Sequence, residues 1–220
     1  MASADEIYGR MRESIELYDP TLAEKAAREA VDAGLDPAAA VEAGFAGPIR
    51  ELGEAFDRME VFLPQLVMAA DAMKAGVKVL EAAMTERGGR LERKGVVILG
   101  TVEGDIHDIG KTVVGAMLQA GGYEVHDLGV EVPAPRFIQA AEEAGAHIIA
   151  MSALLSTTML SQRDVMEMLR SKGLAGKYFA IVGGAPVTAA WAEQIGAHAY
   201  ARDATEAVRV LDSRRDEWAR

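Results

Sequence analysis

The sequence contains no cysteine among its 220 residues. That absence excludes disulfide bonds, cysteine-based zinc sites, iron–sulfur clusters ligated by this chain and catalysis by a thiol. Any transition metal must therefore be held by histidine, by carboxylates or within a prosthetic group. The chain has four histidines, His107, His126, His147 and His198, and no two of them have the His-x-x-x-His spacing of a helical metal site.

Basic residues and long apolar runs are scarce as well. The chain carries 23 Lys and Arg residues against 34 Asp and Glu residues, which gives a formal net charge of −11. Nucleic-acid binding depends on Lys and Arg that neutralise phosphates, so this balance argues against a nucleic-acid partner. No apolar run approaches the roughly 20 residues of a membrane helix, and residues 1–6 lack the basic and apolar regions of a signal peptide. We therefore expect a cytoplasmic protein that binds neither nucleic acid nor membranes.

Apolar residues recur every three or four positions through the first part of the chain, which is the period of amphipathic helices. The pattern predicts helices near residues 7–18, 22–31, 37–56 and 63–84. Gly34 is typical of a helix C-terminus, and Asp36 followed by Pro37 is typical of a helix start. Pro48 should kink or restart the third helix. Four helices joined by short links predict an all-α four-helix bundle over residues 1–90.

The pattern changes after residues 85–94, a charged stretch with Gly88 and Gly89 that we interpret as a linker and possible hinge. Short apolar runs predict strands at residues 96–100, 123–127, 147–152, 178–183 and 197–201. Helical patterns separate and follow them at residues 111–120, 135–144, 158–171, 188–194 and 204–214. This alternation predicts a flavodoxin-like, Rossmann-like α/β domain over residues 91–220, a doubly wound five-stranded parallel sheet. Sheets of this kind bind ligands at the carboxyl ends of their strands.

The segment from Gly104 to Gly110 joins the first predicted strand to the helix that follows it. His107 therefore lies where such folds place ligand contacts. A lone histidine is more often a surface or capping residue, but Asp105 stands two positions before this one. A carboxylate that contacts one imidazole nitrogen fixes the tautomer and raises the donor strength of the other nitrogen. The pattern therefore favours a ligand site, whereas His126, His147 and His198 have no comparable setting and are expected to be structural or exposed.

The same segment also resembles a phosphate-binding P-loop, because it ends in Gly110-Lys111-Thr112. A P-loop has four residues between its glycines, whereas five separate Gly104 from Gly110. The carboxylate of Asp105 would also repel phosphates inside such a loop. Nucleotide hydrolysis is therefore a disfavoured alternative.

Two further blocks follow predicted strands. The third strand ends in a run with four hydroxyl side chains: Ser152, Ser156, Thr157 and Thr158. Helix capping is the simplest interpretation of these hydroxyls, and one of them is expected to cap. The fourth strand ends in Gly183-Gly184, which indicates either a tight turn or the close passage of a ligand. Together the blocks place a histidine, hydroxyls and glycines at one edge of one sheet.

These three blocks resemble the cobalamin-binding domain shared by methionine synthase, certain mutases and the corrinoid proteins of methyltransferase systems. The sequence reads Asp105-x-His107-x-x-Gly110, then 41 residues to Ser152-x-Leu154, then 28 residues to Gly183-Gly184. The helical half is similar to the cap module of methionine synthase, through Phe62-Leu63-Pro64-Gln65-Leu66 and Asp71-Ala72-Met73-Lys74. The resemblance therefore covers nearly the whole chain.

The resemblance implies that cobalamin or a related corrinoid binds in its base-off, His-on form. His107 would be the metal ligand, the lower axial ligand of cobalt. Asp105 would hold the other ring nitrogen, Thr158 or a neighbouring hydroxyl would extend that relay, and Gly110 would make room for the macrocycle. When Co(I) forms, it prefers four coordination, so His107 should leave cobalt and take up a proton.

The resemblance also assigns residues to the nucleotide tail and to the cap. Ser152 and Ser156 would contact the tail, Leu154 belongs to the same motif, and Gly183 and Gly184 would leave room for the tail. Phe62, Leu66 and Met73 are the candidates for the cap that covers the upper face of the corrin.

A cap and one cobalamin domain together resemble the corrinoid carriers of three-component systems. Such a carrier is a non-catalytic subunit that cycles between Co(I) and methyl-Co(III). Its implied partners are a substrate-specific corrinoid methyltransferase, a second methyltransferase with tetrahydrofolate or coenzyme M as acceptor, and a reductive activase. The alternative is a cobalamin-dependent sensor that acts through protein partners.

Overall fold

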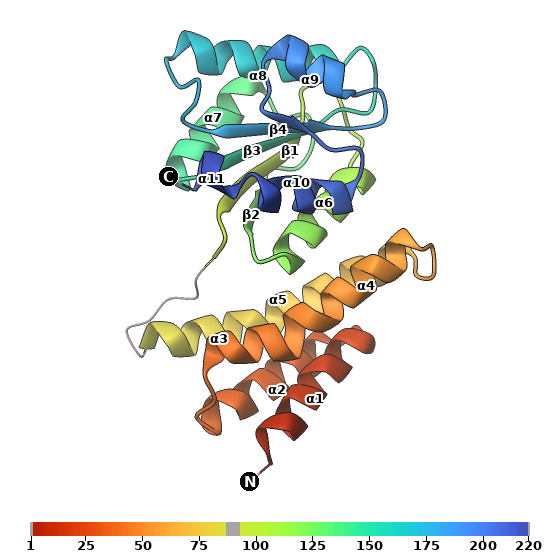
Figure 1. Ribbon diagram of the computed structural model, residues 1–220, viewed down its shortest axis with the longest axis vertical. Coiled ribbons are helices and arrows are strands. Elements are labelled where there is room, and N and C mark those ends of the chain that lie inside the picture. Colours follow the sequence, from red (N-terminus) through yellow and green to blue (C-terminus); the bar gives the residue numbers. More distant parts are fainter. Residues whose placement is uncertain (1, 87–92, 220) are drawn as a thin grey trace. The chain divides into compact units, whose positions relative to one another are not determined.

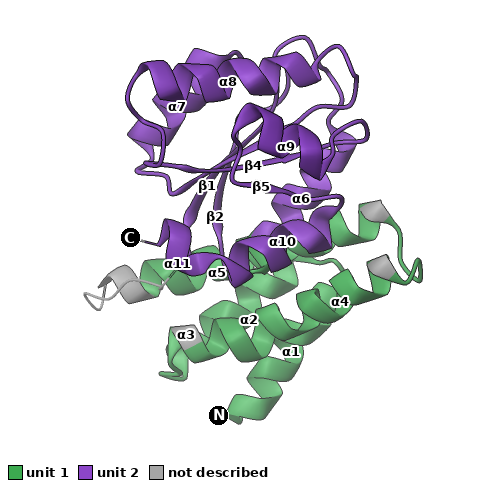
Figure 2. Cartoon of the chain, turned by 45° about the horizontal axis from the view of Figure 1, so that its top comes forward, with its two compact units in different colours: residues 1–93, 119–121 green, residues 94–118, 122–220 purple. Residues whose placement is uncertain are grey.

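The protein is described by a computed structural model over residues 2–86 and 93–219 (Figure 1). The chain divides into two compact units, residues 1–93 with 119–121 and residues 94–118 with 122–220 (Figure 2). Gly88 and Gly89, the residues of the predicted hinge, lie outside the described residues.

Unit 1 contains helices that begin and end where local signals place them. The helices are α1 (Ala4–Glu16), α2 (Pro20–Asp32), α3 (Pro37–Ala40), α4 (Gly47–Asp57) and α5 (Leu63–Glu86). Ser3 and Glu6 form a capping box at the start of α1, and Asp19 caps α2 through the N–H groups of its first turn. Gly34 follows α2 with φ of 72°, as predicted for a helix end. Asp36 accepts a hydrogen bond from the Ala39 N–H at 2.8 Å, which confirms the predicted start of α3.

The third predicted helix is a composite of α3, a π-helical stretch at Val41–Ala46, and α4. Pro48 lies in the first turn of α4 and has no N–H to donate to the preceding turn. The Gly47 N–H instead reaches back to the Glu42 carbonyl, a wider turn than that of an α-helix. Pro48 thus restarts the helix, as predicted.

The core of unit 1 depends on small residues that let helices approach closely. Phe45 is fully buried, and a Cβ added to Gly76 of α5 would lie 2.2 Å from its ring. A Cβ on Gly44 would similarly lie 2.7 Å from the Met11 side chain. These glycines are therefore required by packing rather than by backbone conformation.

Unit 2 is a parallel sheet of five strands in the order β2-β1-β3-β4-β5. The strands are β1 (Val96–Thr101), β2 (Glu124–Asp127), β3 (Ile148–Ser152), β4 (Phe179–Gly183) and β5 (Ala199–Tyr200). The helices are α6 (Ile109–Ala120), α7 (Ala134–Glu143), α8 (Met159–Ser171), α9 (Ala189–Ile195), α10 (Ala204–Ser213) and α11 (Arg215–Trp218). This order is that of flavodoxin-like folds and confirms the predicted fold class. β5 is shorter than predicted, and the sequence analysis did not anticipate α11.

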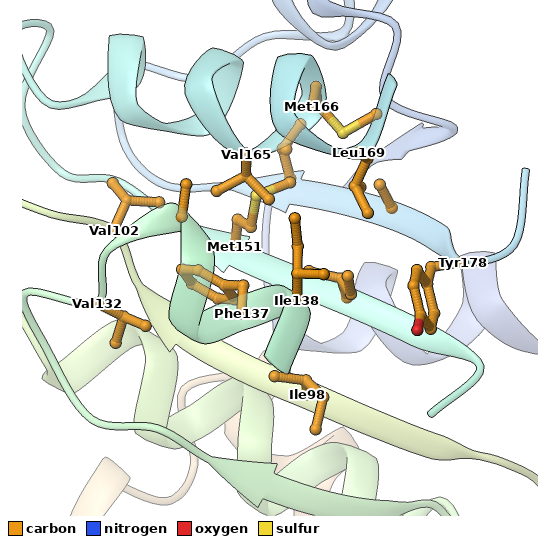
Figure 3. Close-up of a cluster of buried hydrophobic side chains, with 14 of the residues drawn as sticks. Ile98, Val102, Val132, Phe137, Ile138, Met151, Val165, Met166, Leu169 and Tyr178 are labelled. Atoms are coloured by element: carbon orange, nitrogen blue, oxygen red, sulfur yellow. The ribbon is translucent and has the colours of Figure 1, made fainter. Parts of the chain in front are cut away.

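Helices cover both faces of the sheet, because strand residues alternate between the faces. Ile98 of β1 contributes to a core shared with α7, α8 and α9, whereas its neighbours Val97 and Leu99 contribute to one shared with α6, α10 and α11. Figure 3 shows the first of these cores, where side chains of α7 and α8 gather with Ile98 and with Met151 of β3. The doubly wound arrangement leaves the carboxyl edge of the strands free for a site.

Two histidines extend the sheet at the opposite edge. The backbone N–H of His147 donates to the Val96 carbonyl at 3.0 Å, and the ring Nδ1 of His147 accepts the Val96 backbone N–H at 3.1 Å. His198 repeats this arrangement with Ala180, at 2.9 and 3.0 Å. Both are structural, as predicted, and the exposed His126 contacts Glu124. In the part of the chain that the structure describes, no helix is long and apolar enough to cross a membrane.

Candidate functional site

The three sequence blocks meet at the carboxyl edge of the sheet. In the strand register Thr101 pairs with Ser152, and Ser152 pairs with Gly183, so the ends of β1, β3 and β4 form one row. β1 and β3 are the strands between which the chain order of this sheet reverses, the point where such folds bind ligands. The structure therefore brings together the predicted histidine turn, hydroxyl block and glycine pair.

Asp105 is the centre of the hydrogen-bond network in this edge. Its side chain is fully buried, and four donors surround it. Oδ1 faces the His107 N–H at 3.0 Å and His107 Nδ1 at 2.7 Å. Oδ2 accepts from the Leu154 N–H at 2.7 Å and from the Thr158 hydroxyl at 2.6 Å. A single carboxylate thus joins the turn after β1 to the loop after β3.

These donors keep Asp105 ionised. Burial alone would raise its pKa, but the hydrogen bonds from Thr158, Leu154 and His107 together hold the pKa well below the ordinary value. An ionised carboxylate can only accept, so the Nδ1 of His107 must carry a proton. The lone pair of the neutral ring then lies on Nε2, and the side chain is 46% exposed. In its neutral form, His107 therefore presents Nε2 as the nitrogen that can bind a metal.

Two residues that were not assigned to the site from the sequence support this turn. Thr101, which is fully buried, donates its hydroxyl to the His107 carbonyl at 2.9 Å. Lys111 has a side chain that is only 1% exposed, and its ammonium group contacts the carboxylates of Asp108 and Asp127. Because its charge is neutralised there, Lys111 is not placed as the lysine of a P-loop. A sequence signal for this pairing was present, since Asp127 ends the strand beside β1.

The hydroxyl block is used differently from a helix cap. Thr158 stands at the N-cap position of α8 but makes no capping hydrogen bond. Its hydroxyl bonds Asp105 instead, so the cap expected from one of the four hydroxyls is not found at this N-cap, whereas the bond to Asp105 is the contact that the resemblance implies. Ser156 and Leu154 are exposed, and Ser152 is half-buried at the end of β3.

The glycines differ in what they contact. Gly184 has φ of 121°, and a Cβ there would lie 1.8 Å from the Ala153 carbonyl oxygen, so no other residue fits. A Cβ on Gly183 would lie 2.9 Å from the Ala201 carbonyl oxygen. A Cβ on Gly110 would meet nothing within 4 Å, so this exposed position borders open space. Gly184 is thus required by the fold, whereas a side chain at Gly110 would meet no neighbour.

Exposed apolar side chains lie on the two segments that Asp105 joins and at the starts of α6 and α8, the helices that follow them. They are Ile106, Ile109, Leu154, Leu155 and Leu160. Apolar side chains exposed in one region mark a binding surface. A large, flat and mostly apolar macrocycle with a metal at its centre fits these apolar side chains and the exposed side chain of His107.

The predicted cap residues have different environments in unit 1. Phe62 is 73% exposed, whereas Leu66 is fully buried and Met73 is 7% exposed. Met59, which the sequence analysis did not consider, is 86% exposed and has φ of 60°. A contact between the ligand and Leu66 or Met73 stays a prediction that their burial does not favour.

The fold and the site define a corrinoid-binding protein, and comparison with known families agrees. The chain belongs to the B12-binding family: residues 95–211 match a B12 binding domain and residues 7–81 match a second B12 binding domain. The cofactor is therefore cobalamin or a related corrinoid.

Relatives over nearly the whole chain make the class more specific. The chain is 46% identical to dimethylamine corrinoid protein 2 of Methanosarcina mazei, over 94% of this chain and 96% of that protein. It is 44% identical to trimethylamine corrinoid protein 2 of Methanosarcina acetivorans, over 96% of this chain and 97% of that protein. A solved methanol:cobalamin methyltransferase complex from Methanosarcina barkeri contains a chain that matches with a TM-score of 0.85 at 29% identity, over 97% of this chain and 81% of that one. The chain is thus similar to corrinoid proteins of methyltransferase systems.

Proposed function

We propose that this protein is the methyl carrier of a corrinoid-dependent methyltransferase system. It would receive a methyl group from a substrate-specific methyltransferase and deliver it to a second methyltransferase that uses tetrahydrofolate or coenzyme M. A reductive activase would restore the carrier after oxidation. The similarity to dimethylamine and trimethylamine corrinoid proteins over nearly the whole chain supports this role. A cytoplasmic location belongs to the same proposal, and cell fractionation tests it.

The single observation that carries the proposal is the hydrogen bond between the buried carboxylate of Asp105 and the exposed imidazole of His107. When bound, the corrinoid supplies a cobalt centre that takes up and releases a methyl group. His107 would hold this centre from below through Nε2, in the base-off, His-on form. Asp105 would keep the proton on Nδ1 and would stabilise positive charge on the His107 ring. Thr158 and the Leu154 N–H hold the carboxylate in place.

The remaining predicted contacts complete the proposal. The nucleotide tail would lie along the ends of β3 and β4, and the macrocycle would lie over His107. The tail contacts are assigned to Ser152, Leu154, Ser156, Gly183 and Gly184, the macrocycle contact to Gly110, and the cap contacts to Phe62, Leu66 and Met73. We place the cap module within residues 1–90 and the cobalamin module within residues 91–220.

His107→Ala tests the metal ligand directly. The visible spectrum of bound methylcobalamin should change from a His-ligated form to one with water or no lower ligand, because the only imidazole at this edge is gone. His126→Ala is the matched control, since His126 is exposed and contacts only Glu124 among the described residues. An unaltered spectrum in His107→Ala, with the corrinoid still bound, would disprove the axial assignment.

Methyl transfer tests the carrier role. The reconstituted and reduced protein should be methylated by a candidate substrate-specific methyltransferase and demethylated by an acceptor methyltransferase, with matching changes in its absorption spectrum. If no candidate enzyme exchanges methyl groups with it, while light or corrinoid binding changes its association with another protein, a sensor role is the better assignment.

A further inference from the structure

Gln162 is a fully buried polar residue that the proposed mechanism does not use. It lies in α8, and its amide reaches the ends of two strands. Its Nε2 donates to the Met151 carbonyl at 3.1 Å and to the Gly183 carbonyl at 3.2 Å. Its Oε1 accepts the Trp191 indole N–H at 2.9 Å. The amide therefore bonds β3, β4 and α9 at the same time.

The indole of Trp191 sets the orientation of this amide. An indole N–H can only donate, so the oxygen of Gln162 must face it and both N–H groups must face the carbonyls. The Arg163 guanidinium lies over the indole ring, 4.9 Å from its centre, and helps to hold the ring. Both N–H groups and the oxygen of the amide are thus engaged, as a buried polar group requires.

The two carbonyls that Gln162 holds belong to the edge where the site lies. Met151 precedes Ser152, and Ser152 is paired with Gly183 in the strand register. The Gly183 carbonyl also accepts the Ala153 N–H at 3.1 Å, the last hydrogen bond between these two segments before they diverge. Gln162 therefore links β3 and β4 at the point where their ladder ends.

We propose that Gln162 is a positioning residue that sets the separation between the ends of β3 and β4, and thereby the slot for the nucleotide tail of cobalamin. This inference rests on the proposed function. Gln162 is buried beneath this edge and acts through Met151 and Gly183 rather than by contact with the ligand. Thr158, on the same helix, bonds Asp105 and so serves the histidine side of the site. The two residues should therefore affect different parts of the ligand.

A comparison of cobalamin with cobinamide, which lacks the nucleotide tail, isolates this effect. Gln162→Leu keeps the size of the side chain and removes its hydrogen bonds, which leaves buried partners unsatisfied. In the full-length variant, affinity for cobalamin should fall about 10-fold or more, while affinity for cobinamide should change by less than about threefold. The His-ligated spectrum of bound cobinamide should equal that of the wild type. Gln139→Leu is the matched control, because Gln139 is exposed on α7.

Other outcomes overturn the inference. Equal losses for both corrinoids would show that Gln162 only maintains the fold, and unchanged binding of both would show that it does not set the slot. If Gln162→Leu does not fold, Trp191→Phe serves instead, because it removes the indole N–H that orients the amide, keeps an aromatic ring and leaves Gln162 itself in place. A loss confined to cobalamin supports the inference there too, and unchanged or uniformly weakened binding refutes it. If the wild type binds neither corrinoid, the proposed function itself fails.

Discussion

Asp105→Asn replaces the central carboxylate with an amide of nearly the same shape. The carboxylate accepts from four donors, two at each oxygen. An amide offers one oxygen and one NH₂ group, so it can serve only one of these pairs. Whichever way the amide is turned, its NH₂ group faces two donors.

Each orientation has a distinct cost. If the amide oxygen faces His107, the NH₂ group meets the Leu154 N–H and the Thr158 hydroxyl. If the oxygen faces Leu154 and Thr158, the NH₂ group meets the backbone N–H of His107 and its Nδ1. Nδ1 must then accept, which moves the ring proton to Nε2 and removes the lone pair that would bind cobalt.

The loss of stability follows from the hydrogen bonds. A hydrogen bond to a charged group contributes roughly 1.5–3 kcal/mol, and either orientation leaves one backbone N–H, of His107 or of Leu154, without its acceptor. The unfolding free energy of unit 2 should therefore fall by roughly 1.5–3 kcal/mol. The pH dependence should change as well. Because the pKa of Asp105 is lowered in the fold, its contribution is fully present above the unfolded pKa of about 4 and is lost as the pH falls toward the folded pKa. The Asn variant should lack this part of the acid sensitivity.

Tryptophan fluorescence during denaturant unfolding measures this loss, because both tryptophans, Trp191 and Trp218, lie in unit 2. The visible spectrum of bound methylcobalamin measures the tautomer effect, as a smaller His-ligated fraction. Asp164→Asn is the matched control, since Asp164 is exposed on α8. Wild-type stability together with a wild-type spectrum in Asp105→Asn would refute the reasoning about this carboxylate.

Two further predictions concern stability away from the site. Gly76→Ala should destabilise the protein by about 1–3 kcal/mol in thermal unfolding followed by circular dichroism, because the new Cβ would lie 2.2 Å from the Phe45 ring. Gly9→Ala, where a Cβ meets nothing within 4 Å, should instead stabilise by up to about 1 kcal/mol, and equal effects of the two would contradict the packing argument. Burial, and after it the charge of Arg214, lower the pKa of His198, so the fold favours the neutral ring. The contribution of His198 to the free energy of unfolding is therefore fully present above about pH 6.5 and is lost as the pH falls below that value. In His198→Asn the side-chain oxygen can accept the Ala180 N–H without titrating, so this variant should not lose stability at low pH through residue 198. A pH profile of unfolding equal to that of the wild type would contradict this prediction.

Local features of the sequence were sufficient to predict the order of the helices and strands and the pairing of Asp105 with His107. Hydrophobic period, glycine and proline positions predicted the helices and strands, because these signals act over a few residues. Asp105 and His107 could be paired from the sequence because they are two positions apart within one turn. One of the four hydroxyls after β3 was expected to cap α8, but Thr158, at the N-cap position, makes no such hydrogen bond. Its hydroxyl bonds a carboxylate 53 residues away in the sequence, and local sequence signals do not reveal that partner.

The sequence by itself determined a helical module, a doubly wound sheet and a histidine turn at its carboxyl edge. Only the tertiary structure decided what holds that turn. The strand register aligns Thr101, Ser152 and Gly183 in one row. The packing of α8 against the sheet brings the amide of Gln162 within hydrogen-bond distance of the Gly183 carbonyl. Phe62 is exposed, and the spacing of residues in the sequence does not specify that exposure. The physical reason is that burial and long-range hydrogen bonds depend on which faces meet, and that is settled when the elements pack together.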